Sequence, residues 1–179
     1  MGGWRVDRIG EVRGPQLELV PRLAVVEGSD VAVPSGARWL LQGATSADRY
    51  TTPGERERLL AVQAPLGRPA ATHAALIPIK KSEDWWALNH DQRRAIFEER
   101  SHHIATSLDY LPMIARRLHH SRDLGQPFDF LTWFEYAAAA TDAFEELVAR
   151  LRGSEEWTFV VREVDIRLTR EPGAVSAQR

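Results

Sequence analysis

The sequence contains no cysteine among its 179 residues. This absence excludes disulfide bonds, thiolate nucleophiles, zinc–thiolate sites and iron–sulfur clusters. Any metal centre must therefore be built from histidine, aspartate, glutamate or tyrosine side chains, or be brought by a cofactor.

The chain also lacks an excess of one charge and any long apolar run. It carries 23 basic and 25 acidic residues, a formal net charge of -2, so no basic surface for nucleic acid is expected. No window approaches the roughly 18 apolar residues of a membrane span, and residues 1–10 have no apolar stretch long enough for a signal peptide. We therefore expect a cytoplasmic protein with neither nucleic acid nor a membrane as partner.

The composition that remains is that of a globular protein. Hydrophobic residues make up 44% and charged residues 27%, and the length fits one domain or two small subdomains that share a core. Proline and glycine interrupt the first 70 residues at short intervals, which predicts short strands and turns. Residues 23–26 and 39–41 have strand length, and residues 55–63 favour a short helix.

The pattern after residue 70 is clearer. Residues 73–79 favour a strand near an edge or an end of a sheet, because Pro78 lies in it. Residues 89–108 favour a helix capped by Asn89 or Asp91. Strands are expected at 113–122, at 128–136 and from 157, with a helix over 137–152 and a disordered tail over 171–179. The order strand, helix, strand, strand, helix, strand indicates an α+β fold with a ferredoxin-like unit.

Histidines occur as two adjacent pairs, at residues 102–103 and 119–120. In a continuous helix over 89–108, His103 borders the apolar face whereas His102 faces water. A neutral imidazole beside an apolar pocket suits axial ligation of haem iron. A surface or core role is nevertheless the commoner one for a single histidine.

Arg116 is the second unusual residue. Alternation places it between Ile114 and Leu118 on one face of a strand. A guanidinium in an apolar stripe is costly unless an anionic or polar group meets it. An ion pair with a neighbouring strand satisfies this as well as a binding site does.

Two charged pairs also have alternative interpretations. Glu155 and Glu156 are either a solvated acidic pair or contribute a carboxylate that accepts the Nδ1 proton of a histidine ligand. Lys80 and Lys81 are either an exposed turn or supply a cation for a cofactor carboxylate.

Together these residues resemble the chlorite dismutase family over about two-thirds of the chain. The resemblance is most specific in two spacings, 13 residues from His103 to Arg116 and 53 residues from His103 to Glu156. It rests on Lys81-Ser-Glu-Asp-Trp85-Trp86, His103, Leu108-Asp-Tyr110-Leu111, the segments 116–121 and 129–135, Phe144 and Glu156-Trp157, with Gly43-Ala-Thr-Ser46 and Arg49-Tyr50-Thr51 upstream.

The resemblance implies a haem b site. In it His103 is the proximal iron ligand, Glu156 its hydrogen-bonding acid and Arg116 the distal catalytic arginine. Residues that hold the haem edge and propionates match Lys81, Tyr50 and Trp86.

The resemblance also implies an architecture, a dimeric α+β barrel of ferredoxin-like units. The length is similar to that of the short subfamily, whose members tend to be homodimers. Residues 1–70 then form a truncated N-terminal ferredoxin-like subdomain, and residues 71–170 form a complete C-terminal one that binds haem.

The family includes both chlorite dismutases and coproheme decarboxylases. The decarboxylases use a tyrosine just before the strand proline, where this chain has Ile77, and isoleucine cannot form the tyrosyl radical. The resemblance therefore implies conversion of chlorite to chloride and dioxygen, with Arg116 holding the anion. A haem-binding, sensing or peroxidase-like protein and a cofactor-free barrel with a decayed site remain the alternatives.

Overall fold

The computed structural model describes residues 2–28, 33–45 and 50–171. They form a seven-stranded antiparallel sheet in the order β2-β1-β7-β4-β6-β5-β3. Its strands are β1 (Gly2–Arg13), β2 (Arg22–Val25), β3 (Ala44–Thr45), β4 (His73–Lys81), β5 (Ala115–His120), β6 (Phe130–Tyr136) and β7 (Val160–Arg170). The α+β class and the predicted element order after residue 70 both agree with this arrangement.

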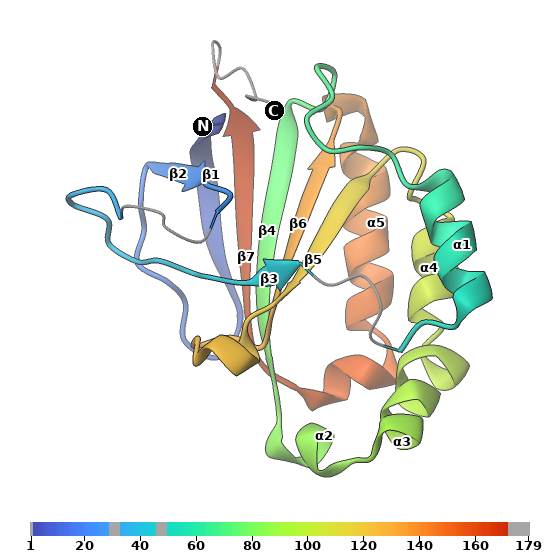
Figure 1. Cartoon of the computed structure of the whole chain (residues 1–179). Helices are drawn as coiled ribbons and strands as arrows, with labels where there is room; N and C mark the ends of the chain where they lie inside the picture. Colours follow the sequence, from blue (N-terminus) through green and yellow to red (C-terminus); the bar gives the residue numbers. More distant parts are fainter. Residues whose placement is uncertain (1, 29–32, 46–49, 172–179) are drawn as a thin grey trace.

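Five α-helices accompany the sheet in the described residues. They are α1 (Pro53–Val62), α2 (Glu83–Ala87), α3 (His90–Arg94), α4 (His103–Leu108) and α5 (Thr141–Arg152). Figure 1 shows α1, α4 and α5 together on the side of β5 and β6, away from β1 and β2. Within the described segments, no helix is long and apolar enough to cross a bilayer.

The sheet buries both of its faces, which is why β4 is buried along most of its length. On one face Ile77 and Ile79 pack with apolar side chains of α5. On the other face Ala74 and Leu76 pack with β1 and with apolar residues of the loop between β1 and β2. A strand covered on both sides must be nearly continuously apolar, as residues 73–79 are.

The placement of Pro78 corrects one prediction. The strand β4 lies in the centre of the sheet, between β7 and β6. Its pairing with β7 is present at Leu76 and at Ile79, but not at the two residues between them. Proline has no N–H to donate, so the central strand accommodates Pro78 where its ladder to β7 is interrupted.

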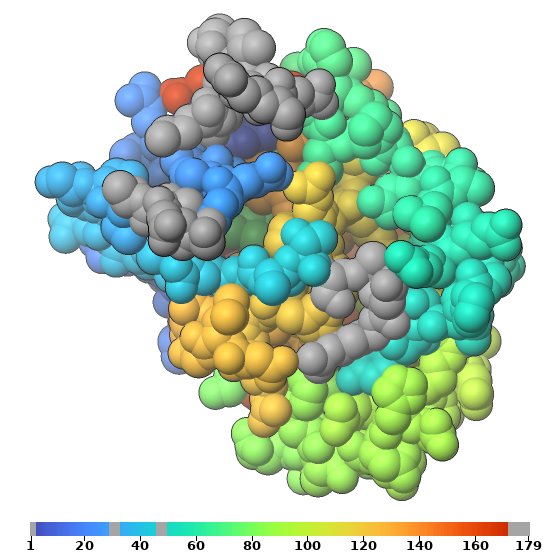
Figure 2. Space-filling model, viewed as in Figure 1, coloured from blue at the N-terminus to red at the C-terminus, as the bar shows by residue number. Residues whose placement is uncertain are grey.

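The first half of the chain also differs from the prediction. Residues 39–41 form no strand; Trp39 donates its indole N–H to the carbonyl of Glu18 (3.0 Å) and packs against the back of the sheet. Figure 2 shows residues 33–45 crossing the visible face beside the loop around residue 124, where the Gln42 amide N–H bonds Gln126 (3.0 Å).

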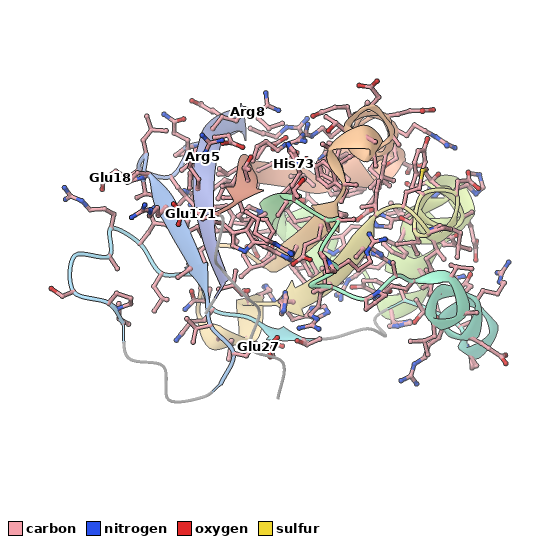
Figure 3. All side chains as sticks on the ribbon, turned by 90° about the horizontal axis from the view of Figure 1, so that it is seen from above. Arg5, Arg8, Glu18, Glu27, His73 and Glu171 are labelled. Carbon is pink, nitrogen blue, oxygen red and sulfur yellow. The ribbon has the colours of Figure 1, made fainter. Side chains whose placement is uncertain are left out.

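The long strand β1 escaped prediction because charged residues interrupt its apolar pattern. Figure 3 shows Arg5, Arg8 and Glu18 at the end of the molecule opposite α1 and α4. The charged residues of β1 and of the loop after it therefore lie near the β2 edge of the sheet, remote from α1 and α4.

The end of the chain departs from the prediction at two points. Residues 157–159 belong to a 3-10 helix (Glu155–Phe159), so the last strand begins at Val160. Glu171, expected in the disordered tail, accepts a hydrogen bond from Arg22 (2.9 Å). The rest of that expected tail, residues 172–179, lies outside the described residues.

The helix expected over residues 89–108 is interrupted in the structure. After α3 the chain forms a π-helix (Ala95–Arg100), and His102 then adopts a left-handed conformation with φ 52°. The carboxylate of Glu98 accepts hydrogen bonds from the backbone N–H groups of Ile104 (2.6 Å) and Ala105 (3.2 Å). These bonds satisfy donors that a helix N-terminus leaves open, so α4 starts anew at His103.

We predict that Gly43→Ala destabilises the fold. A Cβ at Gly43 meets the His119 Cβ at 2.7 Å and the Ser121 Oγ at 2.9 Å, so β3 must move away from β5. We expect a loss of about 1–3 kcal/mol in the free energy of unfolding, measured with urea.

Gly54→Ala provides the control for that measurement. A Cβ at Gly54 meets nothing within 4 Å, and Gly54 lies in α1, so this variant should be neutral or slightly stabilised. Equal stability of the two variants would show that the β3–β5 contact is not tight.

Candidate functional site

A cavity lies between the sheet and the helices. Small-molecule sites are lined mainly by apolar side chains, and this cavity is of that kind. One wall comes from β4, β5 and β6: Ile77, Ile79, Lys81, Arg116, Leu118, His120, Phe130, Thr132 and Phe134. The other comes mainly from α4, α5 and the segments beside them, among them Phe97, His103, Ile104, Ser107, Val148, Leu151, Glu156 and Trp157.

His103 reaches this cavity because it is the first residue of α4. Its side chain is 15% exposed, whereas His102 is exposed. The less exposed histidine of the pair is the one predicted from the sequence, although that prediction assumed a continuous helix, which the π-helix and the left-handed His102 replace.

Glu156 joins His103 to Lys81. The Nδ1 atom of His103 lies 2.7 Å from Glu156 Oε2, and the ammonium of Lys81 donates to Glu156 Oε1 at 2.7 Å. The N–H of Glu156 bonds Ser101 Oγ (2.9 Å), which fixes the 3-10 helix against the helix interruption. Because a carboxylate only accepts, Nδ1 carries a proton, and in the neutral ring of His103 the lone pair then lies on Nε2.

The environment keeps Glu156 ionised. Burial alone would raise the pKa of this carboxyl, but the charges and hydrogen bonds of Lys81 and His103 outweigh burial and hold its pKa at about 2. Burial lowers the pKa of Lys81, and Glu156 opposes that fall. The ammonium also lies over the rings of Trp85 (4.3 Å) and Trp157 (5.6 Å). Lys81 therefore lines the cavity, but its charge is directed at Glu156.

Arg116 lies in the opposite wall, on β5. Its Nε atom is buried without a hydrogen-bond partner among the described residues, so the ion pair with a neighbouring strand is not formed by this atom. Burial lowers the pKa of Arg116, yet a guanidinium stays protonated in proteins. Gln63 donates to the carbonyl of Arg116 (2.9 Å). The cavity thus contains a cationic donor that the protein leaves available.

Tyr50 is buried at the edge of the cavity with a positive φ of 69°. Arg94 donates to its carbonyl and to both carboxylate oxygens of Glu55 (2.8 and 2.5 Å). These bonds hold the pKa of Glu55 at about 2. Arg93 lies 3.5 Å from the Tyr50 hydroxyl. Two arginines of one helix therefore fix Tyr50. The motif residues 46 and 49 lie outside the described residues.

Trp86 is the predicted site residue that the structure does not place in the cavity wall. Trp85 lines the cavity instead. Trp86 donates to Asp129 (3.1 Å), and its ring stacks on Phe130 at 6.0 Å. The guanidinium of Arg122 lies 4.1 Å from its ring centre. Trp86 therefore contacts the site through Phe130.

Several cavity residues were not predicted from the sequence. His120 follows Arg116 by four residues on the same strand face, so alternation already pointed to it. Glu163 and the apolar residues of α5 could not be found this way, because only the fold brings them to the cavity.

The sequence of this chain matches a known protein family. The family model described as chlorite dismutase matches residues 29–171. The chain belongs to the chlorite dismutase family. This membership confirms the resemblance inferred from the sequence.

Individual members of the chlorite dismutase family differ in how much of this chain they match. The dimeric chlorite dismutase structure from Nitrobacter winogradskyi is 51% identical, with a TM-score of 0.88 over 96% of this chain and 95% of that one. A mutant chlorite dismutase structure from Candidatus Nitrospira defluvii is 29% identical, with a TM-score of 0.61 over 74% of this chain and 54% of that one. The curated chlorite dismutase from Ideonella dechloratans is 36% identical over 93 residues, which span 52% of this chain and 30% of the relative.

We predict that removing one charge of the buried Lys81–Glu156 pair lowers the free energy of unfolding more than removing both. Glu156→Gln leaves the Lys81 ammonium buried without its anion, and breaking a buried pair in this way costs about 3–5 kcal/mol. Lys81→Met in the same chain removes the second charge and should restore most of the free energy of unfolding. A double variant no more stable than the single one, in urea denaturation of both, would contradict the pairing.

Proposed function

We propose that the protein is a haem b oxidoreductase that converts chlorite to chloride and dioxygen. The proposal is carried by one arrangement: Glu156 occupies Nδ1 of His103 (2.7 Å), which leaves Nε2 available in a cavity whose opposite wall holds Arg116. Membership of the family supports the same reaction.

The residues of the cavity fit a haem. A neutral histidine whose Nδ1–H is bonded to a carboxylate is the usual arrangement for a metal ligand, and His103 and Glu156 have it. The largely apolar walls suit a flat hydrophobic ring system. The buried Nε of Arg116, with no partner among residues the structure describes, suits an anion bound in the cavity. Tyr50 stays a proposed haem contact, whereas Lys81 would act through Glu156 and Trp86 through Phe130.

A bound haem would supply an iron able to take an oxygen atom from chlorite and return it. The protein residues have separate tasks. His103 holds the iron, and the negative charge of Glu156 makes its imidazole a stronger donor. Arg116 holds chlorite, and then the chlorine-containing anion, inside the cavity. One chlorite yields one chloride and one dioxygen as the oxygen–oxygen bond forms.

Ile77 in the cavity wall supports this reaction over decarboxylation. Isoleucine has no hydroxyl and cannot give up a hydrogen atom as a tyrosine does. Ile79 and Leu118 add apolar surface to the same wall. The basic groups that β5 contributes to it are Arg116 and His120.

We also propose the finer architecture. The strands of residues 71–170 lie in the order β7-β4-β6-β5, which supports a complete ferredoxin-like unit, and residues 1–70 then form the truncated one. The relative from Nitrobacter winogradskyi is described as dimeric, and we propose a homodimer here. Location in the cytoplasm stays a prediction from the sequence.

Removal of the proposed iron ligand tests the cofactor. His103→Ala should abolish haem retention after gel filtration, seen as loss of the Soret band. His102→Asn is the matched control, because Asn tolerates the left-handed conformation of residue 102 and should keep the band. An unchanged Soret band in His103→Ala would refute the assignment.

Removal of the distal cation tests the reaction. Arg116→Ala should retain haem but lower chlorite-dependent oxygen evolution about 100-fold or more, as removal of an anion-stabilising donor does. Arg117→Ala is the matched control, because Arg117 pairs with Glu27 (2.8 Å) at the surface. Full oxygen yield over many turnovers from Arg116→Ala, or none from the wild type, would contradict the proposal.

A further inference from the structure

Glu163 is a buried carboxylate that the proposed reaction does not use. It belongs to β7, lines the cavity and has a side chain that is 1% exposed. Burial of a charge is costly unless the charge is paired, so its partners indicate what it does.

Two groups hold the two oxygens of this carboxylate. Arg152, at the end of α5, donates twice to Oε1 (2.8 and 2.6 Å). The indole N–H of Trp157 donates to Oε2 (2.7 Å). Glu163 therefore fixes Trp157 from one side while Arg152 balances its charge.

Trp157 lies beside the proposed ligand. Its ring is within 21° of parallel to the ring of His103, at a centroid distance of 6.5 Å. Phe97 is also nearly parallel to His103, at 4.4 Å and 23°. The Lys81 ammonium lies 5.6 Å from the Trp157 ring centre. The plane of His103 is thus set by packing as well as by Glu156.

We infer that Glu163 is a positioning residue for His103, acting through Trp157. The inference rests on the proposed role of His103 as iron ligand. Glu163 holds the indole in place, the indole limits rotation of the His103 ring, and the ring keeps its Nδ1 directed at Glu156. Without Glu163, Trp157 loses its hydrogen-bond acceptor, and the bond that makes His103 a strong donor weakens.

The same charge network provides a control. Arg152 also donates to Asp165 (2.9 Å), and Asp165 binds Arg167, which in turn pairs with Glu145 on α5 (2.7 Å). Asp165 is 3% exposed, and among the described residues the Trp157 indole N–H donates to Glu163 and not to Asp165. Asp165→Asn therefore removes a buried charge from the network without removing the acceptor of Trp157. Figure 1 shows α5 alongside the sheet. This charge network joins the helix to β7.

Two measurements test the inference. In the haem-free protein, NMR of the indole N–H groups reports the hydrogen bond directly, with the Trp157 signal assigned from Trp157→Phe. Glu163→Leu should move that signal upfield, and Glu163→Gln, whose carbonyl still accepts, should move it less. In the haem-loaded ferrous protein, resonance Raman reports the iron–histidine stretching band.

We expect Glu163→Leu and Trp157→Phe to lower the frequency of that band, and the double variant to lower it no further than either single one. Glu163→Gln should restore most of the wild-type frequency. Asp165→Asn should lower the melting temperature but leave the band in place. An unshifted band in Glu163→Leu, or an equal shift in Asp165→Asn, would overturn the inference. Absence of an iron–histidine band from the wild type would overturn the proposed ligation together with it.

Discussion

The site depends on one buried carboxylate that two basic groups share. Glu156 takes the Nδ1–H of His103 on one oxygen and the ammonium of Lys81 on the other, both at 2.7 Å. Three segments far apart in sequence meet there: the end of β4, the start of α4 and the 3-10 helix before β7. Neither of the two charges, on Glu156 and on Lys81, is stable in that place alone. Glu156 and Lys81 thereby fix the histidine tautomer and the position of the three segments that meet there.

Backbone irregularity places these side chains. The two residues other than glycine with positive φ among the described residues are Tyr50 and His102. One borders the cavity and the other immediately precedes His103. The π-helix before His102 is a feature often found at functional sites, and Glu98 caps the helix that restarts beyond it. Strained positions of this kind persist only when surrounding contacts determine them, and here Arg94, Glu98 and Ser101 supply those contacts.

Much of this arrangement follows from the sequence, and the remainder requires the fold. Periodicity predicted the element order after residue 70, and the motifs around His103, Arg116 and Glu156 carried the resemblance to the family. The interruption between residues 94 and 103 was hidden, because π-helix and α-helix share almost the same residue preferences. Pro78 suggested a strand near an edge or an end, but the strand is central, and Pro78 lies where its ladder to β7 is interrupted. The partner of Lys81 was also hidden, since Glu156 lies 75 residues away.

The central claim is that Glu156 orients His103 so that Nε2 receives the iron. A crystal structure of the haem-loaded protein tests it most directly. The account predicts iron on Nε2 of His103, with Nδ1 still bonded to Glu156 and Lys81 still on the other oxygen. Iron bound by another side chain such as His120, or His103 turned so that Glu156 no longer meets Nδ1, would contradict it.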